Sequence, residues 1–204
     1  MICVIAFGLG NVRAILNAYQ RLGIDVIRAT DSSHLDGASK IILPGVGSYD
    51  RAMEGLNNSG MRSTLESLVL NKNIPLLGIC VGMQILSLSS DEGRLPGLGW
   101  VRGKVISFGS KEDSVNLPRP HMGWNSVMPR GSSALFQEIP EKSKFYFLHS
   151  FLFRCDDVTN ILATTEYGGN FSSAVFAKNI YGVQFHPEKS HNVGLQLLKN
   201  FANI

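Results

Sequence analysis

Two kinds of apolar pattern alternate along the first half of the chain. Short continuous apolar runs are typical of strands buried on both faces, and they are separated by stretches whose apolar residues recur at helical spacing. This alternation indicates βαβ units around a parallel sheet. The pattern predicts strands at Ile2–Phe7, Ile24–Arg28, Lys40–Leu43 and Ile74–Ile79, and helices at Val12–Leu22, Tyr49–Leu56 and Met61–Leu70.

Beyond Gly99 the pattern changes to short β-rich segments separated by turn residues, which are typical of antiparallel or mixed sheet. A last amphipathic stretch predicts a helix at Asn192–Phe201. We therefore expect one α/β domain, residues 1–204, with three layers and a mostly parallel central sheet that antiparallel strands extend. The additional strands are predicted at Val101–Phe108, Ser126–Met128, Lys144–His149, Phe151–Cys155, Ile161–Thr165, Ala174–Ala177 and Tyr181–Phe185.

The composition narrows the function and the compartment. Apolar residues make up 44% and charged residues 17% of the chain, and the net charge of +3 is spread without a basic block. Nucleic-acid binding therefore has no electrostatic support. The three cysteines are far apart and form no CxxC pair, which favours a reducing compartment over a disulfide framework. With no basic segment at the start and no apolar run of membrane-spanning length, we expect a cytoplasmic protein without membrane contact.

The most informative segment is Gly78-Ile79-Cys80-Val81-Gly82, which follows an apolar run and precedes a helix-like start. This is the pattern of a nucleophile elbow, a sharp strand-to-helix turn that exposes one reactive side chain. The alternative is a buried structural thiol, the commoner state of a free cysteine. The flanking glycines favour the elbow. We also expect the dipole and amides of the following helix to lower the pKa of the Cys80 thiol.

A second segment, Gln184-Phe185-His186-Pro187-Glu188, places an imidazole and a carboxylate two residues apart after another apolar strand. With Cys80 these residues supply a nucleophile, a base and an orienting group. They could instead be surface residues, or metal ligands together with His191. The zinc deaminase signature, which also begins with His-x-Glu, requires a later Pro-Cys-x-x-Cys, and no cysteine follows His186. The sequence therefore predicts a cysteine-dependent acyl transfer without a metal.

Two glycine-rich turns remain. Pro44-Gly45-Val46-Gly47 follows a strand as an oxyanion loop would, although an ordinary turn between a strand and a helix has the same composition. Gly8-Leu9-Gly10 and Gly45-Val46-Gly47 both mimic the start of a dinucleotide fingerprint. Arg13 and Asp50 occupy the positions of its third glycine, so we expect no NAD, no FAD and no other cofactor.

Together these motifs resemble the class I glutamine amidotransferases, which have a flavodoxin-like fold, and within them the glutaminase subunits of imidazole glycerol phosphate synthase. The resemblance runs from the first predicted strand to the last helix. Its carriers are Gly8-Leu9-Gly10-Asn11, Leu43-Pro44-Gly45-Val46-Gly47, Gly78-Ile79-Cys80-Val81-Gly82-Met83-Gln84, Pro120-His121-Met122-Gly123-Trp124-Asn125, Tyr146-Phe147-Leu148-His149-Ser150 and Gln184-Phe185-His186-Pro187-Glu188-Lys189-Ser190.

The resemblance implies a specific chemistry. Cys80 attacks the side-chain amide of glutamine, His186 carries the proton to the departing ammonia, and Glu188 orients the imidazole. Water then hydrolyses the glutamyl thioester. The oxyanion lies near the amides of Val81 and of Val46 or Gly47. By similarity, the positions that hold glutamine are Gln84 and the backbone around His149, Ser150 and Phe151. His149 taken alone could equally be a core histidine with satisfied hydrogen bonds.

The same resemblance implies a partner. In the family a cyclase subunit with a (β/α)₈ barrel forms a heterodimer with the glutaminase and receives ammonia through an internal channel. The cyclase then makes imidazole glycerol phosphate and aminoimidazole carboxamide ribonucleotide in histidine biosynthesis. The positions that match the family's interface are Asn11, Trp124, Tyr146 and Lys189.

Several residues depart from the pattern of the histidine enzyme. Ala6-Phe7 stands where the family usually has Asp-Tyr, and Ser172-Ser173 and His191 also differ. These features look like paralogues that supply ammonia for an acetamidino sugar of a surface polysaccharide, again through a cyclase-like partner. A stand-alone cysteine hydrolase of the same fold and a non-catalytic binding subunit also stay open. The complete triad disfavours the binding subunit.

Overall fold

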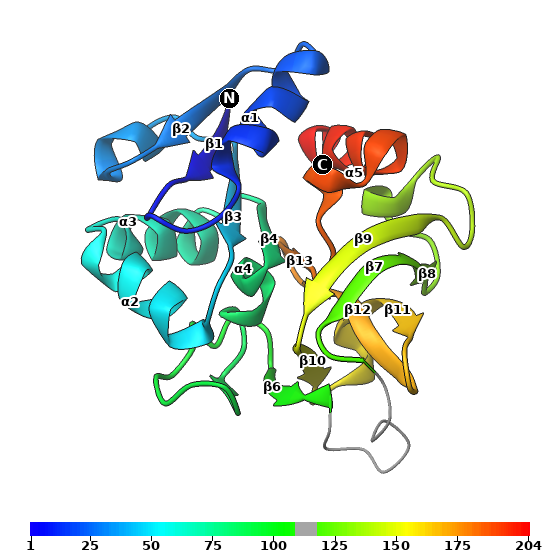
Figure 1. Cartoon of the computed structure of the whole chain (residues 1–204). Coiled ribbons are helices and arrows are strands. Elements are labelled where there is room, and N and C mark those ends of the chain that lie inside the picture. Colours follow the sequence, from blue (N-terminus) through cyan, green and yellow to red (C-terminus); the bar gives the residue numbers. More distant parts are fainter. Residues whose placement is uncertain (109–117) are drawn as a thin grey trace.

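The computed structural model describes residues 1–108 and 118–204 and has a parallel sheet at its centre (Figure 1). Five neighbouring strands run parallel in the order β2-β1-β3-β4-β13. The alternating pattern predicted the first four, and β13 joins them from the half expected to be antiparallel or mixed. The side chains of β1, β3, β4 and β13 are almost all buried, which explains why these strands read as continuous apolar runs. The bounds are β1 Ile2–Ile5, β2 Val26–Ala29, β3 Lys40–Gly45, β4 Leu76–Cys80 and β13 Ile180–Val183.

Strands that pair mostly antiparallel extend this sheet beyond β13, and the short outer pair β5–β6 is parallel. The order continues β12-β10-β6-β5, while β11 pairs with β12 and β8 pairs with β11. The predicted fold class, a mostly parallel sheet with added antiparallel strands, is therefore confirmed. The bounds are β5 Ser89–Ser90, β6 Gly103–Ser107, β8 Met128–Pro129, β10 Phe151–Cys155, β11 Ile161–Glu166 and β12 Asn170–Ala177.

Helices cover both faces of the parallel strands. Figure 1 shows α1 and α5 together on one side and α2 and α3 on the other. The buried Tyr19 hydroxyl donates to the Leu198 carbonyl at 3.1 Å and ties α1 to α5. No helix within the described ranges is long and apolar enough to cross a membrane. The bounds are α1 Val12–Arg21, α2 Tyr49–Asn58, α3 Arg62–Glu66, α4 Val81–Gln84 and α5 His191–Asn203, with short 3-10 turns at Ser32–Leu35, Ala134–Phe136, Val158–Asn160 and Pro187–Lys189.

A two-stranded antiparallel ribbon lies apart from the main sheet (Figure 1). It consists of β7, His121–Ser126, and β9, Lys144–His149. Because side chains alternate along a strand, one face of the ribbon is buried and the other is open. Cross-strand neighbours on the open face are Met122 with Leu148 and Trp124 with Tyr146, and on the buried face His121 with His149 and Gly123 with Phe147.

The prediction of a strand at Ser126–Met128 was wrong. The structure places β7 upstream, at His121–Ser126, and the short β8 at Met128–Pro129. The apolar pattern missed β7 because its inward-facing positions are held by the buried His121 and the half-buried Gly123 and Asn125 rather than by aliphatic residues. A strand whose inner face is polar has no apolar alternation to detect.

Other differences lie at the ends of elements. The helix expected over Met61–Leu70 is α-helical at Arg62–Glu66 and continues as a π-helical turn at Ser67–Asn71. Strand β12 begins at Asn170 rather than at Ala174, because Ser172 and Ser173 are buried in the sheet despite their hydroxyls. A prediction from the spacing of apolar residues does not detect polar residues that are buried in a sheet.

Glycine allows β3, β4 and α4 to approach closely where β4 ends. A side chain at Gly82 would overlap the carbonyl oxygen of Leu43, and a Cβ at Gly78 would lie 2.6 Å from the Gly82 carbonyl oxygen. Only hydrogen fits at these two positions. The glycines that flank Cys80 are therefore required by packing between backbones.

We predict that Gly82→Ala destabilises the protein by about 3 kcal/mol, the upper end of the cost of overpacking a rigid core. The reason is that the new methyl group meets backbone atoms of β3, which have no rotamer to change. Chemical denaturation of purified protein measures the free energy of unfolding. Glu54→Ala, an exposed change on α2, serves as the control and is expected to stay within about 0.5 kcal/mol of wild type. Equal stability of Gly82→Ala and wild type would contradict the prediction.

Candidate active site

Three parallel neighbours bring the chemistry to one edge of the sheet. In register, Gly45 at the end of β3 lies opposite Cys80 at the end of β4, and Val183 at the end of β13 lies opposite Ile79. The residues that follow these strand ends therefore meet at the carboxyl edge, the usual place for ligands in open parallel sheets.

Cys80 has the backbone of a nucleophile elbow. Its φ is 56° and its ψ is −114°, a conformation that non-glycine residues rarely adopt. The side chain is 4% exposed, and the thiol donates a long hydrogen bond of 3.9 Å to the Leu148 carbonyl on the ribbon. The helix that follows differs from the expectation, since α4 is a single turn, Val81–Gln84. A helix dipole grows with the number of aligned peptide units. The dipole of a single turn is therefore small and contributes little at the Cys80 sulfur.

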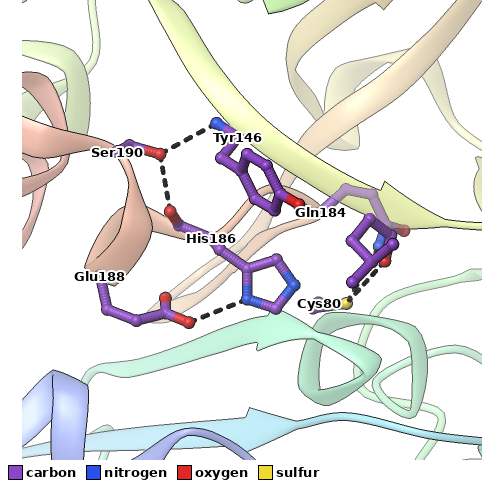
Figure 2. Close-up of polar contacts among 7 residues, drawn as sticks. Cys80, Tyr146, Gln184, His186, Glu188 and Ser190 are labelled. Atoms are coloured by element: carbon purple, nitrogen blue, oxygen red, sulfur yellow. Dashed lines mark hydrogen bonds and ion pairs between the residues drawn. The ribbon is translucent and has the colours of Figure 1, made fainter. Parts of the chain in front are cut away.

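His186 and Glu188 form a buried pair beside the sulfur (Figure 2). The imidazole Nδ1 lies 2.9 Å from the Glu188 Oε1, and the two side chains are 4% and 1% exposed. The turn Pro187–Lys189 brings the carboxylate back beside the ring, and Pro187 at its first position suits a helical φ. The other carboxylate oxygen of Glu188 is buried and has no hydrogen-bond partner within the described part of the chain.

The environment of His186 favours its charged form. Burial by itself lowers the pKa of the imidazole, but hydrogen bonds and charge interactions with Cys80 and Glu188 outweigh burial and raise it to about 10. The ring is therefore positioned between a sulfur and a carboxylate that both favour an imidazolium. Such a group can deliver a proton to a leaving nitrogen.

A serine that sequence reasoning missed holds the turn in place. The buried Ser190 hydroxyl donates to the His186 carbonyl at 2.6 Å and accepts from the Tyr146 amide at 3.0 Å (Figure 2). The His186 amide donates to the Tyr146 carbonyl at 2.9 Å. These three bonds fasten the His186 turn to β9. The spacing offered a signal, since a serine four residues after His186 can reach back to its carbonyl across one tight turn.

Gln184 was also missed, and it lies next to the sulfur. Its Nε2 lies 3.7 Å from the Cys80 Sγ, and its Oε1 accepts from the Gln84 Nε2 at 3.0 Å. The Gln84 Nε2 also donates to the Phe151 carbonyl at 3.2 Å. Both hydrogens of that nitrogen are thus used, and the atom that Gln84 can offer a substrate is its Oε1. Its place in the sequence offered a signal, because Gln184 lies two residues before His186 in the segment that leaves β13.

The side chains enclose a pocket of about 310 Å³. Ten of the residues predicted from the sequence line it, namely Val46, Gly47, Cys80, Val81, Gln84, His149, Ser150, Phe151, His186 and Lys189. Glu92, Pro120 and Leu148 also line it and were not predicted. Glu92 Oε2 accepts from the Tyr49 amide at 2.9 Å, and burial raises the pKa of this carboxyl group. Glu92 comes from a loop with no strand or helix pattern, so the sequence carried no signal for it.

Of the predicted interface positions, Asn11, Trp124 and Lys189 are exposed and Tyr146 is half-buried. Trp124 is 45% exposed and stacks on His191, with ring centroids 4.9 Å apart and planes 9° from parallel. The Lys189 ammonium lies 5.5 Å from the centre of the Tyr146 ring. Asn11 is exposed before α1 and does not cap that helix with its side chain. Lys189 is the one member of this set that also lines the pocket.

The molecule has a second groove, and its described residues contain no group of metal ligands. A larger groove of about 560 Å³ lies along residues 128–142, away from the cysteine and the histidine. Within residues 1–108 and 118–204, no group of three His, Cys, Asp or Glu side chains lies close enough to share a metal ion.

Comparison with known proteins gives the same class of enzyme. The family model described as glutamine amidotransferase class-I matches residues 3–204. The imidazole glycerol phosphate synthase subunit HisH of Bdellovibrio bacteriovorus is 55% identical over 204 residues and 100% of both chains. The subunit HisH 2 of Pseudomonas aeruginosa is 41% identical over 204 residues, again with 100% of both chains covered.

Solved structures confirm the fold. A structure described as glutamine amidotransferase has a TM-score of 0.75 at 20% identity and covers 100% of this chain and 99% of its own. PurLQS from Thermotoga maritima has a TM-score of 0.75 at 18% identity, with 99% and 97% covered.

We predict that the His186 ring is protonated on both nitrogens at neutral pH and titrates near pH 10. Because this pKa lies above the usual 6.5, protonated His186 stabilises the folded state. This contribution is fully present below pH 6.5 and is lost as the pH rises through about 10. Nitrogen NMR shifts of the imidazole measure the titration. Glu188→Gln should lower the pKa because it removes a charge that favours the imidazolium, whereas Glu54→Gln on exposed α2 should not. A neutral ring at pH 7 in the wild type would refute the assignment.

Proposed function

The chain belongs to the class I glutamine amidotransferases, and within them to the family of imidazole glycerol phosphate synthase subunit HisH, and we propose that its pocket hydrolyses L-glutamine and releases ammonia to a cyclase subunit. The observation that carries the proposal is the position of Cys80 beside a buried His186–Glu188 pair at the sheet edge. The 55% identity to a HisH subunit over the full chain supports the pathway.

The reaction divides into two transfers. The Cys80 sulfur attacks the side-chain carbonyl carbon of glutamine while His186 holds the thiol proton. The imidazolium then gives that proton to the amide nitrogen, the C–N bond breaks and ammonia leaves. Water, deprotonated by His186, hydrolyses the glutamyl thioester, which frees the Cys80 sulfur and restores the protonated ring of His186. Glu188 keeps the ring oriented and its charge balanced throughout.

The pocket offers groups for the rest of the substrate. The amides of Val81 and of Val46 or Gly47 are the donors we assign to the oxyanion. Glu92 supplies a carboxylate for the substrate's ammonium group, and Gln84 supplies its Oε1. The backbone at Ser150 and Phe151 forms the remaining edge of the pocket.

A partner is needed because ammonia released into water is protonated and lost as a nucleophile. We propose that a cyclase subunit with a (β/α)₈ barrel docks on the surface that carries Trp124, Tyr146, Lys189 and Asn11. Exposed Met122 and Leu148 on the same ribbon face add apolar area to that surface. The acceptor is a phosphoribulosyl-formimino carboxamide nucleotide. An acetamidino-sugar pathway would use the same glutaminase half-reaction, and an assay of the complex with each acceptor separates the two.

We predict that Cys80→Ser lowers glutamine-dependent synthesis by at least about a thousandfold and leaves ammonia-dependent synthesis by the partner intact. The reason is that the nucleophile serves only the release of ammonia. His186→Ala should be similarly severe and Glu188→Gln milder, since orientation contributes less than the base. The measurement is product formation by the reconstituted complex with glutamine or with ammonium salt.

Cys155→Ser is the matched control, because Cys155 lies at the far end of β10 and outside the pocket. It should keep wild-type activity with either nitrogen source. A Cys80→Ser complex that used glutamine at the native rate would remove the basis for the triad.

We also predict that the isolated chain hydrolyses glutamine about a hundred- to a thousandfold more slowly than the complex, the loss that one missing oxyanion donor causes. Val46 is 39% exposed and Gly47 has a φ of 92° with no neighbouring atom at its Cβ position, so this loop is free to turn its amides away from the sulfur. A docked partner would hold the loop in one orientation.

Glutamate release measures this prediction for the chain alone, with the partner, and with the partner plus an acceptor analogue. Cys80→Ser sets the background of the assay. Full activity of the chain alone would favour a stand-alone hydrolase.

A further inference from the structure

Two histidines that the reaction does not use lie buried between the open ribbon face and the pocket. His121 on β7 and His149 on β9 are cross-strand neighbours, 3% and 5% exposed. The His121 Nδ1 lies 3.0 Å from the His149 Nε2. Buried imidazoles in contact are costly unless each nitrogen has a partner of the right kind.

The groups at the two ends of this series of hydrogen bonds determine which ring nitrogens carry a proton. The Asn125 Oδ1 accepts from the Ser126 amide at 2.8 Å, so the Asn125 Nδ2 is the atom that faces the His121 Nε2 at 3.2 Å and the Glu166 carbonyl at 2.9 Å. The His121 Nε2 must then accept. At the other end the His149 Nδ1 lies 2.7 Å from the Phe151 carbonyl, which can only accept.

Both ends therefore require the same arrangement. His121 donates from Nδ1 to the His149 Nε2, and His149 donates from Nδ1 to the Phe151 carbonyl. Each ring is neutral with one proton, since a second proton on either would place two donors face to face. Burial lowers the pKa of His121 to about 4 and that of His149 to about 3, which agrees with this arrangement.

The chain of bonds ends at the catalytic sulfur. The Phe151 carbonyl that accepts from His149 also accepts from Gln84, which binds Gln184, and Gln184 contacts the Cys80 sulfur. Protons cannot pass along this chain, because the Phe151 carbonyl receives a donor from both sides. Its bonds can fix positions.

We propose that His121 is a positioning residue that, together with His149, holds the β7–β9 ribbon against the Phe151 edge of the pocket. Contacts made on the open face of the ribbon are thereby coupled to the binding of glutamine in the pocket. The inference rests on the proposed function. The ribbon has no strand pairing to the main sheet within the described residues. Side-chain contacts therefore set where it lies, the apolar ones of Phe145 and Phe147 together with the polar ones of His121 and His149. The open neighbours of His121 and His149 in the same register are Met122 and Leu148, on the proposed docking surface.

Packing is the competing explanation for His121. Its ring stacks between Tyr167, with centroids 3.9 Å apart, and Phe147, with centroids 4.7 Å apart. Two substitutions separate packing from hydrogen bonding. His121→Phe keeps an aromatic ring in the stack and loses both hydrogen bonds. His121→Asn loses the ring, but its amide nitrogen occupies the place of Nδ1 and can donate to His149.

The experiment measures KM and kcat for glutamine in the complex with the cyclase partner, together with ammonia-dependent synthesis and thermal stability. We expect His121→Phe to raise the KM for glutamine about tenfold, the effect of one buried acceptor left unpaired, and His121→Asn to stay within about threefold of wild type. Ammonia-dependent synthesis should not change. The same two substitutions at exposed His34, which is paired with Asp31 on the surface, are matched controls without effect.

The opposite order, with His121→Asn impaired and His121→Phe normal, overturns the proposal in favour of packing. The proposal is also overturned if both variants have the KM of wild type or if both are impaired equally. If His121→Phe does not fold, His121→Leu takes its place as the variant without hydrogen bonds. A raised KM in His121→Leu with a near wild-type KM in His121→Asn then supports the proposal, and any other order overturns it. Failure of the proposed function looks different, because wild type would then show no glutaminase activity that depends on Cys80.

Discussion

Cys80 turns the chain from β4 into α4 with a φ of 56°, a conformation that costs a non-glycine residue about 1–3 kcal/mol. The surrounding sheet holds the residue there. β4 is the middle strand of three, with β3 and β13 hydrogen-bonded on its two sides, and Gly78 and Gly82 let the backbones of β3 and α4 close over the turn. The strain fixes where the sulfur lies, and every other group in the pocket is positioned relative to it.

The histidines show how neighbours decide the charge of one residue type. His186, His121 and His149 are all buried, and burial by itself lowers the pKa of each. His186 meets the Glu188 carboxylate and the Cys80 sulfur, so its pKa rises. Among the described residues, the ring nitrogens of His121 and His149 bond only each other, the Asn125 amide and the Phe151 carbonyl, so both rings stay neutral. The protein thus keeps a charge where a proton must move and excludes it where only position matters.

The sequence predicted the parallel sheet, the class of enzyme and the elbow because these depend on local patterns. An apolar run followed by Gly-x-Cys-x-Gly has few other structural solutions, and the comparisons confirmed the family. It failed for β7, whose inner positions are His121, Gly123 and Asn125. Ser190 was missed although its spacing from His186 offered a signal. Nothing in the sequence indicated Glu92, because its role depends on which segments lie beside it in space. The roles assigned to the site residues remain predictions.

The molecule divides into a rigid part and a part with fewer bonds. The sulfur, the His186 turn and residues 45–47 all lie at the ends of strands of the parallel sheet, whose hydrogen bonds are continuous. The ribbon pairs only with itself among the described strands. Its contacts with the body include the Ser190 hydroxyl, the Tyr146 backbone, the histidine pair, the Asn125 bond to Glu166 and the packing of Phe145 and Phe147 on Phe185. Segments with few shared backbone bonds open at lower free energy than the core does. A partner bound to the ribbon can therefore change the pocket while the sheet, and the strained Cys80 that it holds, stays in place.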